Sequence, residues 1–176
     1  MFLNFRKLAF TIALILSTGL NILKSQSIVM LDYQPTLGRF EVGQSYESYK
    51  YFLSSPVGEY GGKWKNYTGL GKTEQLFGLK IEQVHLLFQD NKLHGFSLEL
   101  QDIGTDHDNY DLFYIHNKLK DKFGEETGSM SLKGKDFQDD WKGSFIVCML
   151  YYSYTGNGWS PRITILKRPD KFPLKD

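Results

Sequence analysis

The chain has 176 residues, of which 23% are charged and 15% aromatic, and its formal net charge is +1. This balance of charge excludes the strongly basic surface that nucleic-acid-binding domains use, so no nucleic-acid partner is expected. A single cysteine, Cys148, excludes an intramolecular disulfide, and the fold must be held by its apolar core. Cys148 lies in the apolar run 145–152, which favours a small buried hydrophobe over a nucleophile.

The first 27 residues have the pattern of a secretory signal peptide. Arg6 and Lys7 give a positive start without an acid, and the apolar run 8–16 follows. Small side chains at Ser25 and Ser27 place the expected cleavage after Ser27. A retained anchor is the weaker alternative, because the apolar run falls short of the roughly 20 residues that span a bilayer.

We therefore expect an exported protein, periplasmic or secreted, with no stable membrane anchor after cleavage. Removal of residues 1–27 takes away three cations and no acid, so the net charge changes from +1 to about −2. Residues 28–176 have the length of one domain with a core of its own, and the segment 167–176 is expected to be a loose tail.

The first predicted elements are a short helix and a glycine-rich loop. Residues 43–45 open the helix, Tyr46 and Tyr49 lie on one face with Leu53, and Pro56 ends it. The glycine-rich stretch that follows predicts a loop around one short strand at 63–67, with Trp64 as the inward anchor of that strand.

The clearest element is a hairpin around the turn 89–92. Apolar residues alternate before and after this turn, which predicts one buried face made of six side chains: Val84, Leu86, Phe88, Phe96, Leu98 and Leu100. A three-residue turn with a bulge would place all six on that face.

A second helix is predicted over residues 109–123, and Gly124 is its stop. Its buried stripe carries Leu112, Ile115, Leu119 and Phe123, and His116 is expected to be a packed residue at the flank of that stripe. Polar residues over 125–140 predict a mobile loop. A second hairpin then follows, with one strand at 145–152 and the other at 163–166.

These elements predict an α+β fold, an antiparallel sheet of about five strands with two helices packed on one face. The two halves of the chain are in step, since each begins with a helix and ends with a hairpin. This pattern suggests an internal duplication of one helix-plus-sheet unit.

An acidic loop supplies the candidate metal ligands Asp106, Asp108 and Asp111, because carboxylates bind hard cations. The loop lacks the central glycine and final glutamate of a calcium loop, and acids before a helix also interact well with its dipole. With His107, Asp106 and Asp108 are the candidate residues of a hydrolase or metal-dependent enzyme. The chain has no recognised catalytic motif, so we expect no enzyme and no cofactor.

Aromatic side chains supply the candidate binding residues. Tyr151, Tyr154 and Trp159 crowd the second hairpin, and Trp64 is a fourth candidate. Exposed tyrosines and tryptophans are common in protein interfaces and sugar sites, whereas the alternative is that these side chains fill the core.

The first half resembles a known family through residues 43–45, Leu53, Pro56, Trp64 and Tyr67, followed by the strand and turn at 84–93. Over residues 42–93 this pattern is similar to the small outer-membrane-assembly lipoprotein domain (SmpA/OmlA, or BamE-like). Two such units in tandem would look like the β-lactamase-inhibitor-protein architecture. The resemblance implies a non-enzymatic, protein-binding domain outside the cytoplasm. The chain departs from the family pattern in two ways: it lacks the lipidated cysteine, and its loop between Pro56 and Val84 is long and glycine-rich.

We therefore expect an exported, non-enzymatic binding module whose partner is another protein. One alternative is a small-molecule or glycan-binding domain, which predicts a pocket lined by aromatic side chains with a few polar groups. The other is the hydrolase or metal-dependent enzyme of the acidic loop at residues 102–111.

Overall fold

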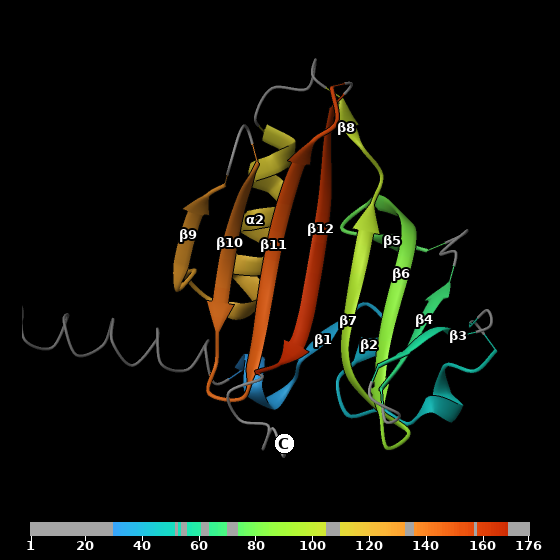
Figure 1. The fold of residues 1–176 in the computed structure, drawn as a ribbon. Coiled ribbons are helices and arrows are strands. Elements are labelled where there is room, and N and C mark those ends of the chain that lie inside the picture. The colour runs from blue at the N-terminus through green and yellow to red at the C-terminus, as the bar shows by residue number, and fades with distance from the viewer. Residues whose placement is uncertain are drawn as a thin grey trace, which may run out of the picture.

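The computed structural model describes residues 30–51, 53, 56–60, 64–69, 74–104, 110–132, 136–156 and 158–168. Within these residues the α+β class is confirmed, and an antiparallel sheet dominates the fold (Figure 1). Eight strands follow one another in the spatial order β3-β4-β6-β7-β12-β11-β10-β9, while β5 pairs with β6 and β8 pairs with β12. The prediction of about five strands was therefore too small.

The strands of this sheet are β3 (Pro56–Tyr60), β4 (Trp64–Gly69), β5 (Gln75–Leu76), β6 (Leu79–Gln89), β7 (Lys92–Leu100), β8 (Ile103–Gly104), β9 (Gly128–Ser131), β10 (Phe137–Lys142), β11 (Ile146–Tyr154) and β12 (Gly158–Lys167). A separate small pair is formed by β1 (Thr36–Leu37) and β2 (Phe40–Glu41). The helical elements are a 3-10 turn, η1 (Tyr46–Ser48), and the helix α2 (Tyr110–Phe123), and residues 30–33 are also helical.

The sheet consists of two halves with the same order of elements. In each half a helical segment, η1 or α2, precedes a meander of four main strands. The last strands of the two meanders, β7 and β12, pair with each other and join the halves into one sheet (Figure 1). This order matches the predicted repeat of a helix-plus-sheet unit.

One face of the sheet is buried across its central strands, from β6 to β11. The six side chains predicted for the first hairpin are all buried, and in the second hairpin the same face carries Cys148, Leu150, Tyr152, Ile163 and Ile165. Cys148 is confirmed as a buried hydrophobe, and burial raises the pKa of its thiol. We call this the inner face.

The helix α2 lies against the inner face of the β9–β12 half (Figure 1). Its side chains Ile115, Leu119 and Phe123 are buried, as their helical spacing predicted. Gly124 ends the helix as expected, with a positive φ of 82° that costs glycine little. No helix among the described residues is both long and apolar enough to cross a membrane.

The N-terminal segment covers the inner face of the other half. Phe40 contacts Phe96, and both Tyr46 and Tyr49 contact Phe88 through their rings. The predicted first helix is wrong in extent, because within the described part of residues 43–55 only the three residues of η1 are helical. The amide of Tyr46 donates to the carbonyl of Asn91, so the backbone before η1 is held by the first hairpin in place of an earlier helical turn.

The predicted loop at 125–140 was also wrong, because it contains β9 and most of β10. Strand β3 likewise lies in the glycine-rich stretch that predicted a loop. Backbone groups form the ladder bonds of a sheet, so polar or glycine-rich segments can serve as strands near its edges. The turn of the first hairpin has two residues, Asp90 and Asn91, both with positive φ, and a bulge follows in β7.

Candidate functional site

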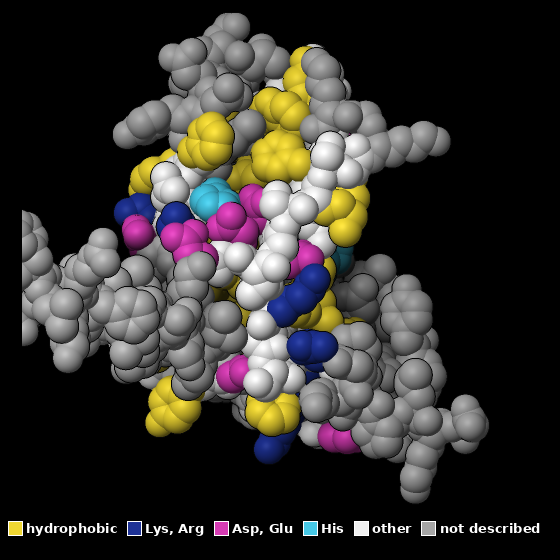
Figure 2. Space-filling model, turned by 90° about the vertical axis from the view of Figure 1, so that its left-hand side faces the viewer, with side chains coloured by type: hydrophobic (Ala, Val, Ile, Leu, Met, Phe, Trp, Pro, Cys, Tyr) yellow, Lys and Arg dark blue, Asp and Glu magenta, His cyan; other side chains and the backbone are white. Residues whose placement is uncertain are grey.

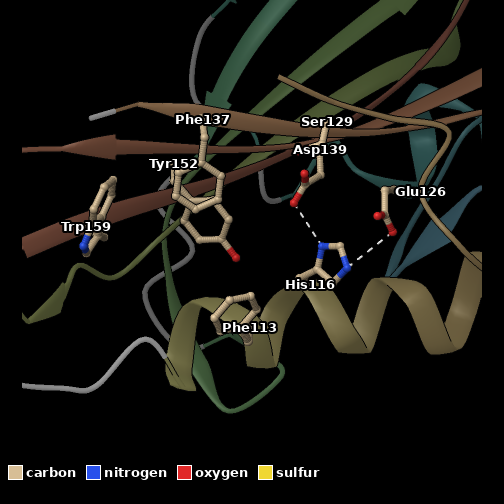
Figure 3. Close-up of a pocket in the computed structure, with 8 residues that line it drawn as sticks. All are labelled: Phe113, His116, Glu126, Ser129, Phe137, Asp139, Tyr152 and Trp159. Carbon is tan, nitrogen blue, oxygen red and sulfur yellow. Dashed lines mark hydrogen bonds and ion pairs between the residues drawn. The ribbon is translucent and has the colours of Figure 1, made fainter. Parts of the chain in front are cut away.

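A cavity of about 460 Å³ lies between α2 and the inner face of the β9–β12 half. Figure 3 shows that its lining side chains come from the helix, from the segment after it and from four strands. The lining residues are Phe113, His116, Glu126, Ser129, Phe137, Asp139, Tyr152 and Trp159. We refer to this space as the α2 cavity.

Three ionisable side chains form the polar wall of the α2 cavity. His116 projects from α2, and its Nδ1 lies 3.0 Å from Oδ2 of Asp139 on β10. On the other side of the ring, Nε2 lies 3.5 Å from Oε2 of Glu126, in the segment between α2 and β9. Both carboxylates therefore turn toward one imidazole (Figure 3). An imidazole donates at both nitrogens only when it is protonated.

Asp139 occupies a position at which the sheet would otherwise carry an apolar side chain. Phe137, Asp139 and Trp141 alternate onto the inner face of β10, and Asp139 lies opposite Leu150 of β11. Only 7% of Asp139 is exposed. A buried carboxylate costs free energy that a single imidazole partner offsets in part. Polar residues at core positions that cost stability are typical of functional sites.

Aromatic rings form the opposite wall. The ring of Phe137 lies 4.5 Å from that of Tyr152 and 5.6 Å from that of Trp159, measured between centroids. Phe113 on α2 is 62% exposed and stands at the rim. Burial, together with the charge of Asp139, raises the pKa of Tyr152, so its hydroxyl stays protonated and can donate or accept a hydrogen bond.

The α2 cavity opens on one side of the molecule. Figure 2 shows that side, with a histidine side chain bordered by acidic groups and by a cluster of hydrophobic side chains. No lysine or arginine is among the lining residues that the structure describes. With Asp139 and Glu126 ionised, the polar wall carries a formal charge of −1 when His116 is protonated and −2 when it is neutral.

The structure does not describe the side chains of the predicted metal ligands. Asp106, His107 and Asp108 lie outside the described residues, and of Asp111 only the backbone, in the first turn of α2, is described. In the described part of the chain, no group of three or more histidine, cysteine, aspartate or glutamate side chains could hold a metal ion.

The predicted binding residues separate in space. Tyr154 and Trp159 share the inner face, with ring centroids 5.2 Å apart, and Trp159 lines the α2 cavity. Tyr151 lies on the opposite face, where its hydroxyl donates to Oδ2 of Asp136 at 2.8 Å. The side chain of Trp64 lies outside the described residues. The hairpin aromatics therefore do not form one continuous surface.

The sequence did not point to the other lining residues. His116 was expected at the flank of the helix stripe, and Asp139 fell in a segment predicted as a loop. The available signal was the alternation of Phe137, Asp139 and Trp141, which indicates a strand with an acid on its buried face.

No protein-family model, no curated protein and no solved structure matches this chain. The resemblance of residues 42–93 to the SmpA/OmlA domain therefore stays a prediction. The function has to be inferred from the α2 cavity itself.

Proposed function

We propose that the protein is an exported, non-enzymatic binding module that holds a small organic molecule in the α2 cavity. The observation that carries the proposal is the division of one cavity into an aromatic wall and a charged wall. Ligand sites are typically clefts of roughly 300–1,000 Å³ with apolar walls and a few converging polar groups. The volume of about 460 Å³ lies within this range.

The cost of the polar wall supports a binding role. Burial of Asp139 on an otherwise apolar face destabilises the fold, and a purely structural contact between α2 and β10 needs no charge. Trp141 already joins the same two regions, because its indole N–H donates to the carbonyl of Gly124 at 2.7 Å. The charged groups are therefore best explained by a ligand that they contact.

The geometry supports binding over catalysis. Both nitrogens of His116 are directed at carboxylates, so the ring has no nitrogen directed at a nucleophile. Ser129 supplies a hydroxyl to the cavity, yet among the described residues no hydrogen bond joins it to His116. Activation of a serine requires such a bond to a base.

The positions of the hairpin aromatics favour a small ligand over a protein partner. Tyr151 faces away from Tyr154 and Trp159, so these three side chains cannot contact one partner surface together. Trp159 instead forms part of the cavity wall. The protein partner expected from the sequence stays a prediction.

A matched pair of helix variants tests the proposal. Phe113 lines the cavity and is mostly exposed, whereas its neighbour Tyr114 is 38% exposed and does not line it. Ligand-observed NMR with a chemically diverse fragment library should give hits for the wild type that Phe113→Ala weakens and Tyr114→Ala retains. Fragments that bind both variants equally, or no hits at all, would contradict a ligand site in the α2 cavity.

A further inference from the structure

The charges of the α2 cavity point to a class of ligand, an inference that rests on the proposed function. We infer that the ligand is an organic cation, an amine that carries a flat apolar body. The amine would lie against Asp139 and Glu126, and the apolar body would lie against the aromatic wall. Figure 3 shows the two walls on opposite sides of the same space.

The polar wall is short of hydrogen-bond donors. Oε2 of Glu126 is buried and makes no hydrogen bond, although it lies 3.5 Å from Nε2 of His116. The Glu126 side chain lines the cavity and is 32% exposed, so a ligand can approach this side chain. A buried acceptor without a donor is costly, and an ammonium group supplies up to three donors together with a positive charge.

The net charge of the wall selects against other ligands. With both carboxylates ionised it is negative in either state of His116, and among the described residues no lysine or arginine lines the cavity to attract an anion. A carboxylate or phosphate ligand would therefore meet repulsion from Asp139 and Glu126. The wall would attract a cation and concentrate it at the opening.

The aromatic wall is suited to the same class of ligand. The faces of aromatic rings attract cations, and their apolar area covers a flat organic body. Two of the four rings that the structure describes there belong to phenylalanines, Phe113 and Phe137, which offer no hydrogen bond to a sugar hydroxyl. A neutral sugar would also leave the negative charge of the polar wall uncompensated. The set of residues thus favours an amine over a glycan.

A series of probes that share one aromatic body and differ in the head group tests this inference. We would titrate the purified protein with 2-phenylethylamine, 2-phenylethanol and 3-phenylpropionate, and with a methyl glucoside, by isothermal titration calorimetry. The amine is expected to bind at least about tenfold more tightly than the alcohol, because a hydrogen bond to a charged group contributes more than a neutral one. The carboxylate is expected to bind more weakly than the alcohol.

A matched pair of charge variants separates local contact from the overall charge of the protein. Glu126→Gln keeps the shape of the cavity wall and should weaken amine binding about tenfold, with the affinity for the alcohol unchanged. Glu125→Gln makes the same change of net charge at a neighbour that pairs with Lys120 and does not line the cavity. It should leave both affinities near those of the wild type. Thermal unfolding of both variants checks that each is folded.

The outcomes distinguish the inference from the proposed function. Suppose that the alcohol, the carboxylate or the glucoside binds as tightly as the amine, and that Phe113→Ala weakens that binding. The inference of a cationic ligand is then wrong, and the proposed small-molecule function stands. Equal effects of Glu126→Gln and Glu125→Gln on amine binding would also overturn the inference of a cationic ligand. If no probe binds in a manner that Phe113→Ala weakens, both the inference and the proposed function are contradicted.

Discussion

Nδ1 of His116 lies 3.0 Å from Oδ2 of Asp139, and this contact joins α2 to β10. The two residues meet because the buried stripe of α2 packs on the inner face beside β10. The same contact forms the polar wall of the α2 cavity. Stability and the proposed ligand binding therefore both involve this pair, and variants can separate the two.

We expect His116→Leu and Asp139→Leu each to lower the free energy of unfolding by about 2 kcal/mol. Each substitution removes one side of the contact and leaves the other buried polar side chain without it. The double variant should be more stable than the sum of the single effects predicts, since two apolar side chains suit the interface. Urea unfolding measures all three changes. Additive losses would contradict the contact between His116 and Asp139 as the reason for the cost, and the double variant, which keeps Glu126, should bind the amine probe more weakly than the wild type.

The N-terminal segment is held to the turn between β10 and β11 by one carboxylate. Asp32 accepts backbone hydrogen bonds from Ser144 at 2.6 Å and from Phe145 and Ile146 at 2.9 Å each. Asp32→Ala leaves three amides without this partner and should cost about 1–2 kcal/mol of unfolding free energy, as for a lost helix cap. Asp32→Asn keeps one acceptor oxygen and should lose less. Equal losses in urea unfolding would contradict this assignment.

Gly143 has no room for a side chain while Asp32 is in place. A Cβ on Gly143 would clash with Oδ1 of Asp32, so Gly143→Ala should destabilise the fold. The double variant Asp32→Ala/Gly143→Ala should be no less stable than Asp32→Ala alone, because the clash is gone. If the losses add in thermal unfolding, the clash is not with Asp32.

Gly95 allows the two halves of the sheet to meet. A Cβ at this position would lie 2.8 Å from Cβ of Leu166 and 3.0 Å from the carbonyl oxygen of Ile165 on β12. Gly95→Ala should therefore lower the free energy of unfolding by about 1–3 kcal/mol. Gly128→Ala on β9 is the control, since nothing lies within 4 Å of its Cβ. Similar losses in the two variants would contradict a close approach of β7 and β12.

His94 should make the fold sensitive to acid. Burial lowers the pKa of His94 from 6.5 to about 4; the charge of Lys167 lowers it as well, and that of Asp90 opposes the shift. The unfolded chain therefore binds a proton at higher pH than the folded chain does. The free energy of unfolding should fall as the pH falls from about 6.5 toward 4.

Unfolding measured at several pH values tests this. His94→Asn should lessen the loss of stability in that window, because it removes the group whose protonation favours the unfolded chain. His85→Asn is a control on the opposite face, beside Glu99, and should retain the loss. A loss in His94→Asn as steep as in the wild type would assign the acid sensitivity to other groups.

Export predicts a defined N-terminus. Expression of the full chain in a bacterial host, followed by intact-mass analysis, should give a protein that begins at Ile28. The same protein should occur outside the cytoplasm. A mass that includes residues 1–27 would contradict cleavage, and recovery from the cytoplasmic fraction alone would contradict export.

Local patterns predicted the best elements of the fold and missed others for a physical reason. The alternation of Val84, Leu86 and Phe88 reports one buried strand face, and the helical spacing before Gly124 reports α2. The strands β9 and β10 carry many polar residues, so their sequence resembles a loop. They are strands because β11 offers them a partner ladder, which no local pattern describes.

By itself the sequence determined the α+β class, the buried faces of the first hairpin and the extent of α2, because side-chain periodicity and a stop glycine act over a few neighbouring residues. The tertiary structure alone decided the pairing of β7 with β12 and the composition of the α2 cavity. The register of β10 on β11 turns Asp139 inward, and the packing of α2 brings His116 to it. Such contacts depend on pairing between residues that are far apart in the sequence, and local side-chain patterns do not describe that pairing.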